Sequence, residues 1–204
     1  MALKDKFSTC INTAYTHVEN DGSYAMTREG NTLTLIFEWS NGKLDWYHNI
    51  MFPAKPYRNM ENLWFCHRGF LKVWKSIEPY IKDAIMDETV DHIDIIGYSH
   101  GAAIAQLCFE YVKFNRPEVA VTGVGFGAPR VFWGIANQKV LDRFKDFVVV
   151  KNGRDIVTHL PPVLFGFHHV ATVLKIGESV GLIKDHDGAN YWKYLCELYE
   201  KENI

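Results

Sequence analysis

The sequence lacks long apolar runs and has no apolar segment near its start. No stretch approaches the roughly 18 uninterrupted apolar residues that a membrane-spanning helix requires. Lys4, Asp5 and Lys6 stand where a secretory signal peptide would carry its apolar core. These two absences predict a protein with no transmembrane segment and a cytoplasmic location, with release by another route as the alternative.

Cysteine is scarce and widely spaced. The four cysteines form no C-x-x-C pair and stand at Cys10, Cys66, Cys108 and Cys196. This spacing predicts reduced thiols in helices and strands, in keeping with a cytoplasmic protein. Because the count is even, two disulfides are the alternative.

The sequence also lacks an excess of basic charge. Lys and Arg number 22 against 24 Asp and Glu, a formal net charge of -2. Nucleic-acid binders usually carry a clear basic excess, so this class is disfavoured. No repeat, low-complexity run or linker interrupts the chain, which predicts one globular domain over residues 1–204.

Apolar strands alternate with helical segments along the chain. Predicted strands cover residues 33–37, 92–97, 119–127, 146–152 and 170–176. Predicted helices cover residues 3–18, 69–85, 102–114, 132–144 and 191–199. Strands separated by helices of this length predict βαβ units, and hence an α/β fold with a mostly parallel central sheet and helices on both faces.

The pentapeptide at residues 97–101, G-Y-S-H-G, fits the pattern G-x-S-x-G. An apolar strand precedes it and an alanine-rich helix follows, as in a strand-to-helix turn that exposes a nucleophilic serine. Small residues at Gly97 and Gly101 let the two backbones pass close to the turn. The helix N-terminus faces the centre where negative charge develops. Ser99 is therefore the candidate nucleophile, against the simpler reading of a glycine-flanked surface turn.

A nucleophilic serine needs a base and a carboxylate that orients the base. On such folds the acid follows a strand and precedes the histidine along the chain, which makes Asp155 the candidate acid. Four later histidines could act as the base, namely His159, His168, His169 and His186. His186 lies in a polar turn before the last helix, a setting that suits a base, but the residues themselves leave the choice open.

The chain resembles the class 3 lipases, a family of α/β-hydrolases typified by fungal triacylglycerol lipases. The matching segments are C-H-R-G-F-L-K-V-W at 66–74, I-D-I-I-G-Y-S-H-G-A at 93–102, F-G-A-P-R-V at 126–131, N-G-R-D-I-V-T-H-L-P-P at 152–162 and G-F-H-H-V at 166–170. The resemblance implies an α/β-hydrolase fold with Asp155 as the triad acid. It also places the base in D-H-D-G-A-N-Y, at His186, and makes His169 structural.

The resemblance further implies an oxyanion hole and a lid. The family's F-R-G-S/T loop corresponds to I-F-E-W-S here, which places the hydroxyl donor on Ser40, although Glu38 and Trp39 replace Arg-Gly. The second donor would be the backbone N–H of His100, after the nucleophile. Between Asp45 and Glu61 there is room only for a small flap, because Pro53 and Pro56 disfavour a continuous helix there. The lid is therefore expected to be reduced.

Other chemistries have weaker support. The glycines of V-T-G-V-G-F-G lack the G-x-G-x-x-G spacing of a dinucleotide site. A metal site is disfavoured at the cluster of His168, His169, Asp185, His186 and Asp187. Adjacent histidines on a strand point to opposite faces, so at most one of the pair could join such a site. Cys108 lies in mid-helix, where a thiol is usually a small core group.

These observations predict a serine hydrolase of carboxylic esters, a lipase or esterase, that acts through an acyl-enzyme. The chemistry needs neither a cofactor nor a metal. The expected partner is a small-molecule ester or lipid, and contact with a lipid surface is compatible with the sequence. The alternatives are a thioesterase or peptidase on the same triad, and a catalytically silent hydrolase fold that serves as a binding module.

Overall fold

The computed structural model describes residues 1–20, 22–38, 54–57, 64–134 and 138–202. A seven-stranded sheet of order β1-β2-β3-β6-β7-β9-β11 forms its centre. The strands are β1 (Thr16–His17), β2 (Ser23–Glu29), β3 (Thr32–Phe37), β6 (His92–Tyr98), β7 (Ala120–Phe126), β9 (Phe147–Asn152) and β11 (Thr172–Ile176). The first three pair antiparallel, whereas β3 and the strands after it pair in parallel. The predicted mostly parallel sheet is confirmed.

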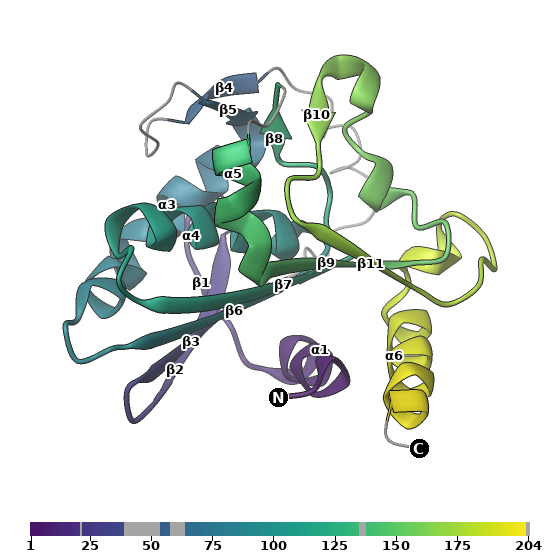
Figure 1. Cartoon of the computed structure of the whole chain (residues 1–204), viewed down its shortest axis with the longest axis horizontal. Coiled ribbons are helices and arrows are strands. Elements are labelled where there is room, and N and C mark those ends of the chain that lie inside the picture. The colour runs from purple at the N-terminus through teal and green to yellow at the C-terminus, as the bar shows by residue number, and fades with distance from the viewer. Residues whose placement is uncertain (21, 39–53, 58–63, 135–137, 203–204) are drawn as a thin grey trace.

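Helices cover both faces of this sheet (Figure 1). One face carries α3 (Arg68–Met86), α4 (His100–Asn115) and α5 (Gln138–Arg143), and the other carries α1 (Leu3–Asn12) and α6 (Gly188–Glu202). Successive side chains of a strand point to opposite faces. In β3, Leu35 and Phe37 therefore join the core beneath α3 and α4, while Ile36 joins the core beneath α1 and α6.

A second, antiparallel sheet of order β10-β8-β5-β4 lies beyond α3 and α4. Its strands are β10 (Phe167–His168), β8 (Phe132–Trp133), β5 (Trp64–His67) and β4 (Ala54–Tyr57). The predicted helix over 132–144 is wrong at its start, at Phe132 and Trp133, because these two residues pair with two strands distant in the sequence. Gly134, at φ 93°, then turns the chain before α5 begins.

Two further expectations concern the ends of elements. The first helix ends at Asn12, well before residue 18, because the following residues form β1 and pair with Ser23 and Tyr24. Of the expected flap between Asp45 and Glu61, only β4 belongs to the described residues, so the reduced lid stays a prediction. The single domain over 1–204 also stays a prediction.

The parallel strands place the candidate site. Because the strands run in one direction, their carboxyl ends meet at one edge of the sheet. Ser99 follows β6 and Asp155 follows β9, while His186 lies in the 3-10 turn η4 (Lys184–His186) beyond β11. Within the described residues, no helix is both long and apolar enough to cross a membrane.

Candidate active site

Ser99 occupies a sharp turn between β6 and α4. Its backbone has φ 55° and ψ -121°, a conformation that residues with a side chain rarely adopt. The turn is held by a hydrogen bond from the Ser99 N–H to the Phe126 carbonyl at 2.8 Å. The residue is 4% exposed and stands at the N-terminus of α4, where the helix dipole favours negative charge.

The two glycines that flank this turn are required by close backbone contacts. A Cβ atom at Gly97 would lie 2.4 Å from the carbonyl oxygen of Gly101. One at Gly101 would lie 2.1 Å from the carbonyl oxygen of Phe37, in the neighbouring strand. Any side chain at either position would push α4 away from the sheet edge and displace Ser99.

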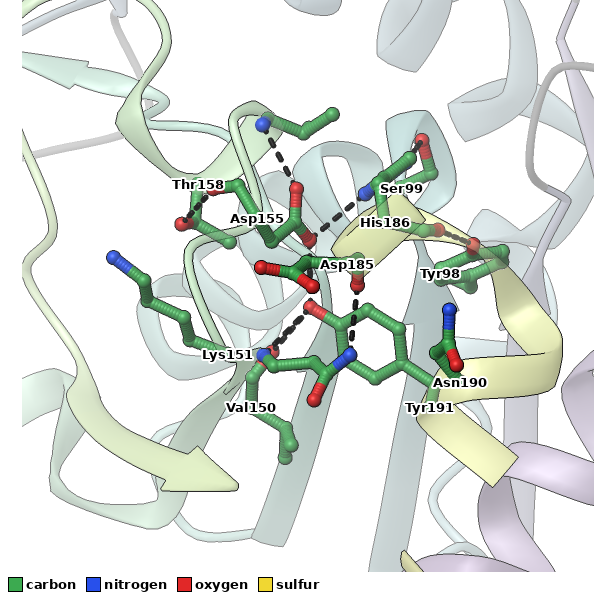
Figure 2. Close-up of polar contacts among 12 residues, drawn as sticks. Tyr98, Ser99, Val150, Lys151, Asp155, Thr158, Asp185, His186, Asn190 and Tyr191 are labelled. Carbon is green, nitrogen blue, oxygen red and sulfur yellow. Dashed lines mark hydrogen bonds and ion pairs between the residues drawn. The ribbon is translucent and has the colours of Figure 1, made fainter. Parts of the chain in front are cut away.

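His186 lies between Ser99 and Asp155 (Figure 2). Its Nε2 is 2.8 Å from Ser99 Oγ, and its Nδ1 is 2.8 Å from Asp155 Oδ2. Because a carboxylate only accepts, Nδ1 carries the proton and Nε2 accepts from the serine hydroxyl. The ring stacks on Tyr98 with centroids 5.3 Å apart, and the Tyr98 hydroxyl donates to the His186 carbonyl. The structure thus brings together three residues predicted from the sequence.

Asp155 is fully buried and each of its carboxylate oxygens accepts hydrogen bonds. Oδ1 accepts from the Val157 N–H at 2.8 Å, and Oδ2 accepts from the Tyr191 hydroxyl at 2.7 Å as well as from His186. The Tyr191 hydroxyl in turn accepts from the Asn152 N–H at 3.1 Å. Burial, together with the nearby Asp155 charge, raises the pKa of Tyr191 well above 10, so its hydroxyl stays a donor.

Sequence reasoning missed the role of Tyr191. The residue belongs to the D-H-D-G-A-N-Y segment, but it reads there as an ordinary aromatic residue of the last helix. It also missed Gly127, which has φ +57°. A Cβ atom there would lie 2.9 Å from His186 Cε1 and 3.0 Å from Asp155 Oδ2. Gly127 therefore leaves the space in which the histidine and the acid meet.

The other candidate bases lie elsewhere. His169 Nε2 is 2.8 Å from the Thr158 carbonyl, and burial lowers the pKa of this histidine to about 4. His159 Nε2 is 2.6 Å from Lys151 Nζ, and burial followed by the Lys151 charge lowers its pKa. His168 lies in β10, in the second sheet. The ring that contacts Ser99 belongs to His186.

Two alternative chemistries find little support in the geometry. Cys108 is buried in α4, and this burial raises the pKa of its thiol well above 9, so the nucleophilic thiolate is disfavoured. No cluster of three or more His, Cys, Asp or Glu residues able to hold a metal ion occurs in the described parts of the chain.

The expected oxyanion hole is only partly described. His100 is the first residue of α4 and follows Ser99 directly, which is the position expected for a backbone donor. Ser40 and Trp39 lie outside the described residues, so the role of Ser40 stays a prediction. Glu38 follows β3, and its Oε2 lies 3.4 Å from Nδ1 of the exposed His17.

Several curated proteins are similar in sequence. A secreted mono- and diacylglycerol lipase of Malassezia globosa is 35% identical over 123 residues, which cover 54% of this chain and 37% of that protein. A lipase of Rhizomucor miehei is 27% identical over 146 residues, covering 68% of this chain and 40% of that protein. The chain thus spans about two fifths of the length of the relatives it matches.

Solved structures of fungal lipases share the fold. The Rhizomucor miehei triacylglyceride lipase superimposes with a TM-score of 0.67 at 21% identity, covering 80% of this chain and 65% of that one. Lipase II from Rhizopus niveus superimposes with a TM-score of 0.68 at 22% identity, covering 80% of this chain and 64% of that one. The predicted α/β-hydrolase fold is confirmed.

The predicted cytoplasmic location is wrong, because relatives from Malassezia restricta, Malassezia globosa and Fusarium solani are named secreted lipases. The prediction relied on the lack of an apolar segment near the start of the sequence, and it used the spacing of the cysteines as a further sign of a reducing compartment. In the structure Cys10, Cys66 and Cys108 are free and buried. Thiols enclosed separately in a core stay unpaired in any compartment, so their state carries no information about location.

The family model for class 3 lipases, described as "Lipase (class 3)", matches residues 34–165. This match contains Ser99 and Asp155 and covers more than half of the 204 residues. The chain belongs to the class 3 lipase family.

Proposed function

We propose that this chain is a serine hydrolase of carboxylic esters that uses Ser99, His186 and Asp155 as its catalytic triad. The observation that carries the proposal is the continuous series of two 2.8 Å contacts from Ser99 Oγ through the His186 ring to Asp155. Nucleophile, base and orienting acid lie within hydrogen-bond reach of one another, as covalent catalysis by serine requires.

In the first half of the reaction, Ser99 Oγ attacks the ester carbonyl carbon while His186 Nε2 takes the hydroxyl proton. Asp155 holds the imidazole in the required tautomer and stabilises the imidazolium that forms. The negative charge on the carbonyl oxygen develops near the N-terminus of α4, where the His100 N–H is one donor and Ser40 is the proposed second. His186 then protonates the leaving alcohol, and the acyl group stays on Ser99.

In the second half, a water molecule attacks the acyl-enzyme. His186 Nε2 takes a proton from this water, and the resulting tetrahedral intermediate collapses to a carboxylic acid as the proton returns to Ser99 Oγ. The buried carboxylate of Asp155 accepts hydrogen bonds from Val157, Tyr191 and His186, and these contacts keep it oriented towards the imidazole ring in both halves of the reaction.

We further propose acylglycerols or smaller esters as substrates. Relatives are named mono- and diacylglycerol lipases, and one similar structure is described as having a serine protease triad at the centre of a triacylglycerol lipase. Because the sequence predicts only a small flap between Asp45 and Glu61, we expect a preference for short- to medium-chain soluble esters. Initial rates across the solubility limit of a short-chain triglyceride test this preference. A sharp rise when droplets form, with long chains favoured, would contradict it.

Labelling with a fluorophosphonate probe tests the activity itself. The wild-type protein should be labelled on Ser99 and should hydrolyse p-nitrophenyl esters, whereas Ser99→Ala should do neither. Ser8→Ala, at a half-buried serine of α1, is the matched control and should behave as wild type. An unlabelled wild-type protein would indicate a silent binding module, and faster cleavage of a matched thioester or amide would indicate a thioesterase or peptidase.

A further inference from the structure

Asp185 immediately precedes the proposed base, and its side chain is fully buried. Both of its carboxylate oxygens are occupied by donors. Oδ1 accepts from the N–H groups of Val180 and Gly181 at 2.7 and 3.2 Å. Oδ2 accepts from the Arg154 N–H and the Ser179 hydroxyl, each at 2.7 Å. These donors come from two different loops, one after β9 and one after β11.

The two loops exchange contacts through consecutive residues. Arg154 donates its N–H to the side chain of Asp185, and the next residue, Asp155, accepts from the ring of His186. The Asp185 carbonyl also accepts from Asn152 Nδ2 at 2.9 Å. Asp185 lies close to Asp155 and His186 in Figure 2. The acid and the base are therefore connected twice, once directly and once through the residue that precedes each.

The surroundings of Asp185 favour its ionised form. Burial opposes the charge, but the hydrogen bonds from Ser179, Val180, Arg154 and Gly181 outweigh it and hold the pKa below 3.8. The loop after β9 is shaped to admit the carboxylate, because Gly153 has φ +44° and a Cβ atom there would lie 2.8 Å from Asp185 Oδ2. A buried carboxylate in this setting stabilises one arrangement of the two loops.

We propose that Asp185 is a positioning residue for ester hydrolysis: its carboxylate fastens the loop that carries His186 to the loop that carries Asp155. This role rests on the function proposed above. Asp185 does not contact the reacting atoms and acts through the placement of the imidazole ring. Displacing a catalytic group by about 1 Å can reduce a rate by about 10²-fold.

Asp185→Asn tests the proposal with almost no change in volume. An amide has one acceptor oxygen, so its NH₂ group must face either the Arg154 N–H or those of Val180 and Gly181. We expect kcat to fall by about 10- to 100-fold with KM within about twofold. We also expect the proton NMR signal of His186 Nδ1–H, assigned by its loss in His186→Ala, to shift or disappear.

Asp187→Asn is the matched control on the other side of His186. Asp187 Oδ1 accepts from the Ala189 N–H at 2.9 Å, and asparagine keeps that acceptor. This variant should retain wild-type kcat and the His186 signal. Ser179→Ala is the milder variant if Asp185→Asn does not fold, since it removes one donor to Asp185, and a fall in kcat of about two- to fivefold is expected.

Circular dichroism and urea unfolding establish that each variant is folded. A folded Asp185→Asn protein with wild-type kcat and an unchanged His186 signal would overturn the proposal. A second result would also overturn the proposal. In it, the loss of activity equals the fraction of Asp185→Asn molecules that are unfolded, and the folded molecules react with fluorophosphonate at the wild-type rate. If the wild-type protein proved inactive, the proposed function would fail, and the His186 signal would still decide whether Asp185 positions the ring.

Discussion

At the scale of the residue, Ser99 combines its proposed chemical role with backbone strain. Its positive φ of 55° costs a residue with a side chain about 1–3 kcal/mol, whereas glycine adopts such conformations readily. Ser99→Gly and Ser99→Ala should both be inactive. Ser99→Gly should nevertheless be the more stable of the two by about 1 kcal/mol, after the greater chain entropy of glycine is subtracted.

Urea unfolding of the two variants and the wild type measures this difference. Equal stability of Ser99→Gly and Ser99→Ala would mean that the turn carries no strain that glycine can relieve.

Tyr191 provides a second prediction at this scale. Tyr191→Phe removes the hydroxyl that donates to Asp155 Oδ2 and leaves the Asn152 N–H buried without this acceptor. We expect the free energy of unfolding to fall by about 1–3 kcal/mol, the usual cost of such a group. We also expect kcat to fall by about tenfold, because Asp155 loses one of the donors that hold it against His186.

The matched control is Tyr194→Phe, at a half-buried tyrosine of the same helix. Its kcat and stability should stay near the wild-type values. If both tyrosine variants lost activity equally, the hydroxyl contact with Asp155 would not be the cause.

At the scale of the element, the crossing of α4 over β3 depends on the lack of a side chain at Gly101. Gly101→Ala would place a Cβ atom 2.1 Å from the Phe37 carbonyl oxygen, a contact with backbone that no rotamer can relieve. We expect a loss of stability of about 3 kcal/mol, at the upper end for overpacked sites, together with loss of ester hydrolysis.

Gly188→Ala is the control for the same change of residue. At this first residue of α6, the nearest atom to an added Cβ atom would be 3.8 Å away. The substitution should leave activity intact and raise stability by up to about 1 kcal/mol. Urea unfolding and rates of ester hydrolysis measure both variants. If Gly101→Ala kept wild-type stability and activity, α4 would be able to shift without displacing Ser99.

Elements were predicted well where the signal lies within the element. The apolar run before Ser99 and the alanine-rich segment after it correspond to β6 and α4. The prediction failed where pairing with distant segments decides, as at Phe132 and Trp133, which belong to β8 and not to a helix. Strand formation there depends on β5 and β10, whose positions no local pattern contains.

At the scale of the whole molecule, His169 makes stability depend on pH. Burial holds its pKa near 4, below the ordinary value of 6.5. Between these two values the unfolded chain binds the proton and the folded protein does not. Stability is therefore fully present above pH 6.5 and is lost as the pH falls towards 4, by as much as about 3 kcal/mol.

His169→Gln tests this dependence, since glutamine can still donate to the Thr158 carbonyl but does not titrate in this range. Urea unfolding measures the free energy of unfolding at pH 7.5 and at pH 4.5. The difference between these two free energies should be smaller for the variant than for the wild type. Equal differences in the two proteins would show that other groups cause the acid sensitivity.

The sequence by itself determined the local parts of this protein: the alternation of strands and helices, the elbow at Ser99, and the candidate acid at Asp155. These depend on residues close together in the chain, whose conformational preferences can be read from their order. From the residues themselves, the choice among four histidines stayed open, although the polar turn around His186 suits a base, and the family resemblance then selected His186.

The tertiary structure decided which groups meet. Ser99 and His186 are 87 positions apart, and Asp155 and His186 are 31 apart. They come together because parallel strands end at one edge of the sheet, so that residues distant in sequence share a small volume. The same convergence gives Tyr191, Gly127 and Asp185 their roles. Each depends on a distance or a vacant space between segments, a quantity that exists only once the chain has folded.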